Sequence, residues 1–293
     1  MKAIVNVSQL VTCAPSDLSP RRGLEMLEVG VIERGAVITD GRVIAAIGTE
    51  SSVSRLLDEV KPEDIYDAGG RAVIPGFVDS HTHALFAGTR EKEFSMRIAG
   101  KPYLEILQEG GGILESRRML IEASDEEVLE QSAMRCKRML AHGTTTAEIK
   151  SGYGLSTEQE IRSLRLINEL GQLTALEVHP TFLGAHAIPP EYKDSRQDYV
   201  KLVANEMIPV VAEKKLARFC DVFCEKGVFD VEETDEIFQS ALAHQLGLRL
   251  HADEIHPIGG TERACAMGAM SVDHLVAVTE SGLEALRNSR TIA

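Results

Sequence analysis

The sequence is poor in the residues and patterns that mark fibrous, disordered and membrane proteins. Its 293 residues include only 10 prolines and 24 glycines, and no apolar run approaches the ~20 residues that a membrane-spanning helix needs. Hydrophobic residues make up 44% of the chain, which is enough apolar surface to offset the entropy lost on folding. These features exclude a collagen-like, low-complexity or membrane-spanning chain and predict one large barrel or two modest domains.

Basic residues are also in deficit. The chain has 31 Lys and Arg against 45 Asp and Glu, which gives a net charge of −14. A field of this sign repels phosphate backbones and anionic lipid heads. We therefore expect neither nucleic acid nor a membrane as a partner.

The five cysteines are odd in number and scattered through the chain. Residues 1–7 alternate like a strand and do not form the apolar stretch of a signal peptide. Together these features predict a reducing, cytoplasmic compartment. Cys220 and Cys224 lie four residues apart in an apolar segment, and we expect them in the core, because a zinc site would need a second pair of ligands.

Residues 1–70 have the pattern of a small β unit. The apolar runs 29–38 and 42–48 flank a turn at 39–41 that contains Asp-Gly, a strong hairpin signal because both turn positions tolerate positive φ. Residues 51–60 are predicted to form a short helix. We expect this first domain to be an antiparallel sheet.

Residues 71–293 alternate between apolar runs and helical segments. The helices have recognisable ends: Ser124 and Glu127 form a capping box, Thr157 opens a helix that Gly171 closes, and 232–245 precedes Gly247. Such alternation predicts a parallel sheet, either a doubly wound sheet or a barrel. The predicted strands are 72–78, 144–149, 174–178, 219–224, 248–251 and 271–275.

Polar side chains follow several of these strands at the point where each strand ends. His81 and His83 follow the first, and His251 ends the fifth. Since residues i and i+2 of a strand project to the same side, both imidazoles of His-x-His can reach one ion at about 2.0–2.1 Å. Glu254 is placed to take a proton from a water that the ion activates. Taken singly, His251 and His274 also fit neutral histidines of the core.

Longer segments of the chain carry a more specific pattern. They resemble the imidazolonepropionase family of the amidohydrolase superfamily along nearly the whole sequence, and the run Lys-Ser-Gly-Tyr-Gly-Leu is not shared by amidohydrolases in general. The matching segments are Ile74–His83, His83–Arg90, Gly110–Leu114, Glu148–Leu155, Phe182–His186, His251–Glu254 and Val272–Leu275.

The resemblance implies an α/β fold, a (β/α)8 TIM-like barrel with a small β-sandwich portion, in which residues 1–70 belong to the sandwich and 71–293 to the barrel. It also implies one zinc or iron ion, held by His81, His83, His251 and a late aspartate. The implied reaction is hydrolysis of 4-imidazolone-5-propanoate, a small anionic substrate, to N-formimidoyl-L-glutamate.

The resemblance also assigns roles to residues outside the ligand set. Arg90, Tyr153 and His186 correspond to substrate contacts, and Glu254 to a substrate contact that is also the acid/base. His274 corresponds to the residue that polarises the carbonyl.

Physical chemistry supports some of these roles. A guanidinium can bind the carboxylate of the substrate through two hydrogen bonds, which suits Arg90, although an ion pair with Glu91 or Glu93 is the alternative. Tyr153 lies between two glycines in a loop whose backbone can approach a ligand closely. Tyr103 is a further candidate contact, with packing on a helix as the alternative.

Some amidohydrolases, which the chain resembles, bridge two metal ions with a carboxylated lysine on the fourth strand, whereas Lys150 ends the second. Glu225 or Lys226 after the fourth strand could bridge a second ion, but we expect one metal ion.

The carboxyl end departs from the family pattern. No aspartate follows Asp273, and roughly 220 residues after Arg71 are fewer than the about 250 of a typical barrel. We therefore expect a barrel truncated after about six strands, in which the fourth ligand is missing. The alternatives are another amidohydrolase, such as a heterocycle deaminase, and a non-catalytic incomplete chain with an unpaired sheet edge. The sequence does not define the oligomeric state, and a homodimer is compatible with it.

Overall fold

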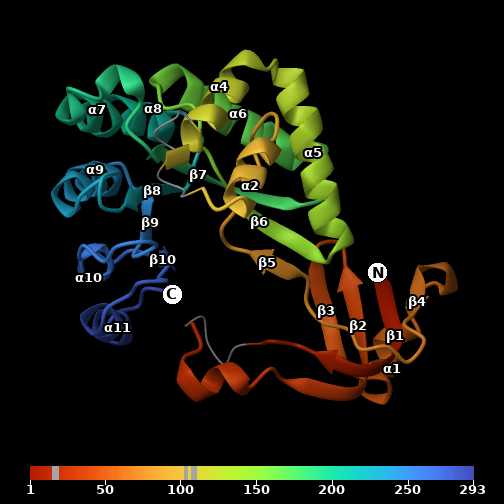
Figure 1. Cartoon of the computed structure of the whole chain (residues 1–293). Coiled ribbons are helices and arrows are strands. Elements are labelled where there is room, and N and C mark those ends of the chain that lie inside the picture. Colours follow the sequence, from red (N-terminus) through yellow and green to blue (C-terminus); the bar gives the residue numbers. More distant parts are fainter. Residues whose placement is uncertain (15–19, 102–104, 107–110) are drawn as a thin grey trace. The chain divides into compact units, whose positions relative to one another are not determined.

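The computed structural model describes residues 1–14, 20–101, 105–106 and 111–293. These residues form two compact units, Met1–Gly76 and Phe77–Ala293, which are described separately (Figure 1). No helix in the described ranges combines the length and the apolar character that crossing a membrane requires. Tyr103 lies outside the described residues.

The first unit contains a four-stranded sheet in the order β3-β2-β1-β4. The β1–β2 and β2–β3 pairs are antiparallel, whereas β1 and β4 are parallel. The expectation of a purely antiparallel sheet was therefore wrong for this last strand, because the chain returns through α1 before it adds β4 beside β1. The elements are β1 (Lys2–Val11), η1 (Gly23–Leu27), β2 (Val31–Asp40), β3 (Val43–Thr49), α1 (Glu50–Leu57), η2 (Pro62–Asp64) and β4 (Ile65–Asp67).

The predicted hairpin is present. Asp40 pairs with Val43, and Gly41 between them has φ +57°, a left-handed conformation that glycine adopts without strain. The helix predicted at 51–60 runs from Glu50 to Leu57 and begins at Thr49, whose side chain accepts a hydrogen bond from the Ser52 N–H.

The second unit contains six parallel strands in the order β10-β9-β8-β7-β6-β5. Each strand pairs with the next one in the chain, so the order never reverses, as it must in a doubly wound sheet. This order resolves the open alternative in favour of a curled, partial barrel. The strands are β5 (Phe77–Asp79), β6 (Thr144–Lys150), β7 (Glu177–Ala185), β8 (Phe219–Cys224), β9 (Gly247–Ala252) and β10 (Ser271–His274).

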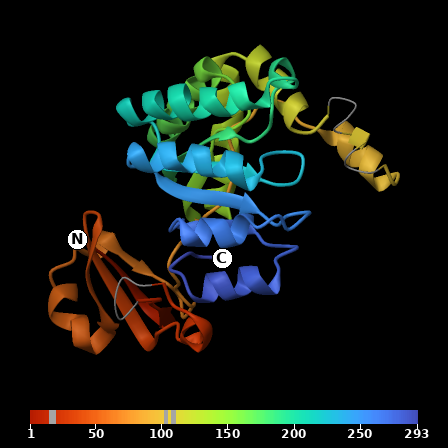
Figure 2. The same cartoon turned by 90° about the vertical axis from the view of Figure 1, so that its left-hand side faces the viewer.

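Helices between the strands pack against the sheet, among them α5 on β6, α6 on β7 and α9 on β8. Figure 2 shows α9, α10 and α11 stacked in chain order. The helices and turns are α2 (Glu91–Ile98), α4 (Ile113–Glu122), α5 (Asp125–Ala141), α6 (Thr157–Leu173), η3 (Pro190–Tyr192), α7 (Arg196–Leu202), η4 (Val203–Met207), α8 (Ile208–Glu213), α9 (Val231–Ala243), α10 (Gly260–Ala266) and α11 (Glu280–Arg287).

Three predicted boundaries were wrong. The run 72–78 is not one strand, because Val73 hydrogen-bonds to the backbone of Val11 and Gln9 in the first unit and β5 begins only at Phe77. The strand predicted at 174–178 extends instead from Glu177 to Ala185, because its second half, from Thr181, pairs with β8. Gly171 does not end α6, which continues to Leu173.

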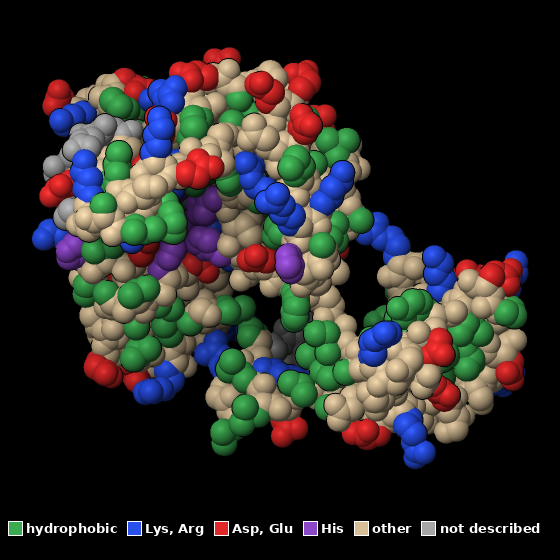
Figure 3. Space-filling view, turned by 45° about the vertical axis from the view of Figure 1, so that its right-hand side comes forward, with side chains coloured by type: hydrophobic (Ala, Val, Ile, Leu, Met, Phe, Trp, Pro, Cys, Tyr) green, Lys and Arg blue, Asp and Glu red, His purple; other side chains and the backbone are tan. Residues whose placement is uncertain are grey.

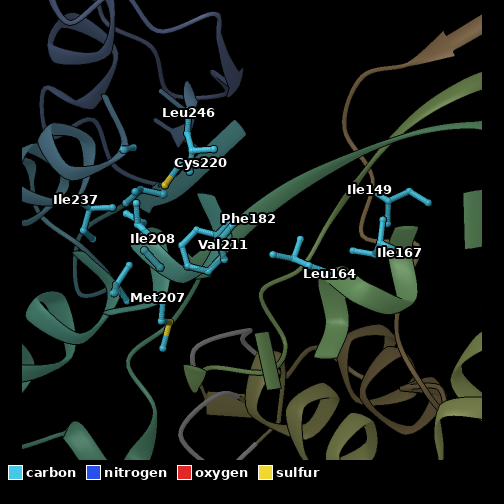
Figure 4. Close-up of a cluster of buried hydrophobic side chains, with 14 of the residues drawn as sticks. Ile149, Leu164, Ile167, Phe182, Met207, Ile208, Val211, Cys220, Ile237 and Leu246 are labelled. Carbon is cyan, nitrogen blue, oxygen red and sulfur yellow. The ribbon is translucent and has the colours of Figure 1, made fainter. Parts of the chain in front are cut away.

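Other local signals are confirmed. Ser124 and Glu127 form the predicted capping box at the start of α5, each side chain accepting a hydrogen bond from the other's backbone N–H. Cys220 and Cys224 are fully buried thiols in β8. Burial raises the pKa of Cys224 to about 12, so it packs as a small apolar residue. Figure 4 shows Cys220 within the hydrophobic core of the second unit, near Phe182 and Leu246.

Candidate metal centre and active site

The histidines predicted from the strand ends come together in the second unit. His81 and His83 follow β5, His186 follows β7, and His251 and His274 lie at the ends of β9 and β10. The ring centroids of His81 and His251 are 4.4 Å apart. Those of His83 and His186 are 4.9 Å apart. Figure 3 shows histidine side chains (purple) gathered in a hollow of the surface.

Three of these side chains are arranged as a metal site would require. One ring nitrogen from each of His81, His251 and His274 lies within 4.8 Å of the others. The Nε2 atoms of His83 and His251 are 3.3 Å apart. The buried Nδ1 atom of His83 has no hydrogen-bond partner among the described residues. Converging imidazoles, one of which has an unpaired buried nitrogen, fit a bound transition metal.

The protonation states also fit a metal site. Burial, reinforced by the neighbouring His186 and His251, holds the pKa of His83 well below its usual value. Burial likewise lowers the pKa of His186 to about 3 and that of His251 to about 4. These imidazoles are therefore neutral near pH 7, which is the form that binds a metal.

A buried charge network lies behind His251. Its Nδ1 is 3.0 Å from Asp221 Oδ1, and the other oxygen of Asp221 accepts a hydrogen bond from Lys150 Nζ at 2.7 Å. Lys150 also donates to Glu148 at 2.8 Å. Burial favours the neutral acid, but His251 and Lys150 hold the pKa of Asp221 well below its usual value. A carboxylate on the second ring nitrogen orients an imidazole ligand and increases its basicity.

Asp273 supplies a further carboxylate at this place. Its Oδ2 lies 3.0 Å from Nδ1 of His81, 3.7 Å from Nη2 of Arg249 and 3.9 Å from Nζ of Lys150. Sequence reasoning assigned no function to Asp273, Asp221, Glu148 or Arg249. One signal was available: Glu148 and Lys150 are charged residues with i, i+2 spacing in an otherwise buried strand, and such residues need partners.

A cavity of about 380 Å³ opens above the histidines. Its lining includes the apolar side chains of Ile113, Leu114 and Phe223. Glu254 Oε2 lies 3.7 Å from Nε2 of His274. The predicted site residues that line the cavity are His83, Arg90, Tyr153, His186, His251, Glu254 and His274.

Arg90 combines both of the arrangements considered for it. Its side chain lines the cavity, and its Nη1 lies 3.6 Å from Oε2 of Glu93. Because the guanidinium is more than one-third exposed, this loose contact leaves it accessible to a ligand.

Several known proteins are similar in sequence to this chain over nearly its whole length. Imidazolonepropionase from Shouchella clausii is 44% identical over 286 residues, which are 97% of this chain and 64% of that protein. Imidazolonepropionase from a Geobacillus species (strain WCH70) is 44% identical over 291 residues, 99% of this chain and 69% of that protein. This chain belongs to the imidazolonepropionase family.

Solved structures show the same fold for this imidazolonepropionase-family chain. N-isopropylammelide isopropylaminohydrolase from Burkholderia multivorans is 17% identical, with a TM-score of 0.60 over 99% of this chain and 67% of that one. Atrazine chlorohydrolase from Arthrobacter aurescens, complexed with zinc, is 13% identical, with a TM-score of 0.52 over 97% of this chain and 70% of that one. No protein-family model matches the chain. The family member described here spans about two thirds of the length of its curated relatives.

Proposed function

We propose that this chain hydrolyses the cyclic amide of 4-imidazolone-5-propanoate to N-formimidoyl-L-glutamate, with one zinc or iron ion as cofactor. The observation that carries the proposal is the set of converging histidines below a cavity that also contains a carboxylate and a guanidinium. Ligands for an ion, a base for the water and a cation for the substrate's tail thereby lie within one site.

His81, His83 and His251 are the proposed ligands: ring nitrogens of His81 and His251 lie within 4.8 Å of each other, and Nε2 of His83 is 3.3 Å from Nε2 of His251. When bound, the ion supplies Lewis acidity that polarises the amide carbonyl and lowers the pKa of water. Imidazole suits both zinc and iron, and the zinc in atrazine chlorohydrolase supports the first. Asp221 holds the ring of His251 in one orientation through its Nδ1.

Glu254 is the proposed acid/base. Its carboxylate lines the cavity next to His274, so it can take the proton of the attacking water and return it to the ring nitrogen that leaves. His274 is placed to hydrogen-bond the carbonyl oxygen as negative charge develops there. Tyr153 and His186 line the same cavity and are proposed to contact the substrate ring.

That the chain forms a homodimer stays a prediction.

The function is tested by turnover of 4-imidazolone-5-propanoate by the chain loaded with zinc or with ferrous iron. We expect loss of the substrate without release of ammonia, and a fall of about 100- to 10,000-fold in kcat for Glu254→Gln, because the amide cannot accept the proton. His244→Ala, at an exposed helix end, is the control and should be fully active. Ammonia release with a purine or pyrimidine amine would favour a deaminase instead, and absence of all turnover would refute the proposed activity.

Replacing Arg90 with methionine should raise KM about 10- to 100-fold with little change in kcat. The guanidinium is proposed to bind the propionate, a contact that is the same in the ground and transition states, and charged hydrogen bonds contribute ~1.5–3 kcal/mol. Steady-state kinetics measures the effect, with Arg97→Met on α2 as the control. An unchanged KM would show that another residue binds the tail.

A further inference from the structure

Glu160 of α6 is a fully buried carboxylate that the proposed chemistry does not use. Its Oε1 accepts hydrogen bonds from the backbone N–H groups of Gly154 and Leu155, both at 2.8 Å. Its Oε2 accepts one from the N–H of Gly152 at 3.0 Å. The three hydrogen bonds from one loop compensate for the loss of water around the charge. The carboxylate thereby holds the backbone of the loop from 152 to 155 in this conformation.

Two glycines allow the loop to close on this carboxylate. Gly152 has φ +106°, and a Cβ there would lie only 2.9 Å from Nδ1 of His186. A Cβ on Gly154 would lie 2.6 Å from the backbone carbon of Gln159. The loop is therefore packed between the first turn of α6 and the ring of His186, at distances that no side chain would permit.

The loop in turn contacts the proposed substrate site at two points. The Gly152 carbonyl oxygen is 2.9 Å from Nδ1 of His186, and since a carbonyl only accepts, Nδ1 carries the proton. The Nε2 of His186 is then a bare acceptor, on a ring stacked 4.9 Å from that of His83. Tyr153, between the glycines, has its ring centroid 5.3 Å from that of His186.

We propose that Glu160 is a positioning residue of the site: by holding the Gly152–Leu155 loop, it fixes the Nδ1–H tautomer of His186 and the place of Tyr153 in the cavity. The part that concerns substrate rests on the proposed function. The tautomer of His186 does not, because it is a property of the free protein.

The first test replaces Glu160 with glutamine. Glutamine has the same shape but exchanges one acceptor oxygen for an NH₂ donor, so it cannot accept from both Gly152 and the Gly154–Leu155 pair. We expect Gly152 to lose its bond, its amide hydrogen to exchange about 10-fold faster, and the ¹⁵N spectrum of His186 to show a mixture of tautomers. Glu233→Gln is the control, since Glu233 is a largely buried carboxylate in α9 that also accepts from a backbone N–H, that of Asp230, although it is paired with Arg196 as well.

Kinetics provides the second readout. In the active, metal-loaded chain, Glu160→Gln should raise KM about 10-fold with kcat changed less than about 2-fold, because Tyr153 and His186 act on binding. Glu233→Gln should leave both constants unchanged. A lower kcat at unchanged KM would overturn the positioning role.

The outcomes separate the two proposals. If the wild-type chain turns over no substrate, the proposed function fails, while the ¹⁵N spectra still decide the role of Glu160. An unchanged His186 spectrum and unchanged Gly152 exchange in Glu160→Gln would overturn that role. If this variant does not fold, the wild-type protein gives the answer: a proton on Nε2 of His186 with a bare Nδ1 would overturn the proposal, whereas a proton on Nδ1 together with slow exchange of the Gly152 amide hydrogen would support it.

Discussion

Replacing Lys150 with methionine is expected to lower the free energy of unfolding by about 3–5 kcal/mol. Lys150 is fully buried and is the ion-pair partner of two buried carboxylates, those of Glu148 and Asp221. Methionine fills a similar space but removes the ammonium that both carboxylates share, which, among the described residues, leaves Glu148 with only Arg249 at 3.4 Å and Asp221 with only the ring of His251. The cost of such unpaired charges exceeds that of almost any apolar replacement in a core.

Urea unfolding at pH 7 measures this effect, since the low pKa of Asp221 keeps its carboxylate charged there. Arg287→Met is the control, because its pair with Glu284 is exposed and should contribute at most about 1 kcal/mol. The Lys150→Met protein should also bind metal more weakly, because Lys150 binds Asp221 and Asp221 orients His251. A loss below about 1 kcal/mol for Lys150→Met would show that the buried pairs do not hold the network together.

Replacing His81 with alanine is expected to abolish metal binding. Loss of a direct ligand should weaken metal affinity by more than the roughly 10- to 100-fold that is typical when a residue hydrogen-bonded to a ligand is replaced. His81 shares the group of converging nitrogens with His251 and His274, and its other contact is Asp273. The expected result is about one ion per chain in the wild type and less than about one tenth in the variant.

Metal analysis of the dialysed protein measures the stoichiometry. His256→Ala is the control, because its Nδ1 contacts Glu225 and it stands outside the group of converging histidines. A full equivalent of tightly bound metal in His81→Ala would exclude His81 as a ligand. In that case His83, His251 and His274 would be the set to test next.

Features encoded by neighbouring residues could be predicted well. The Asp40-Gly41 turn and the capping box of Ser124 depend on contacts within a few residues, and both are present. The strand-end positions of His81, His83, His251 and His274 followed from the same local patterns, and the structure brings these side chains together.

Features that depend on distant segments could not be predicted. The run 72–78 has the composition of a barrel strand, but the backbone groups of Val73 hydrogen-bond to Gln9 and Val11 in the first unit. The strand order that distinguishes a barrel from a doubly wound sheet depends on which strands pair, and an alternating sequence is compatible with both.

The sequence by itself determined which chemical groups stand at the strand ends, because side-chain alternation and turn signals act over a few residues. Only the tertiary structure decided what supports them. Lys150 meets Asp221 across 71 residues of sequence, and Glu160 receives the N–H groups of a loop that precedes its helix. These partners are set by strand register and helix packing, and a buried charge is stable only where that packing brings its partner within hydrogen-bond distance.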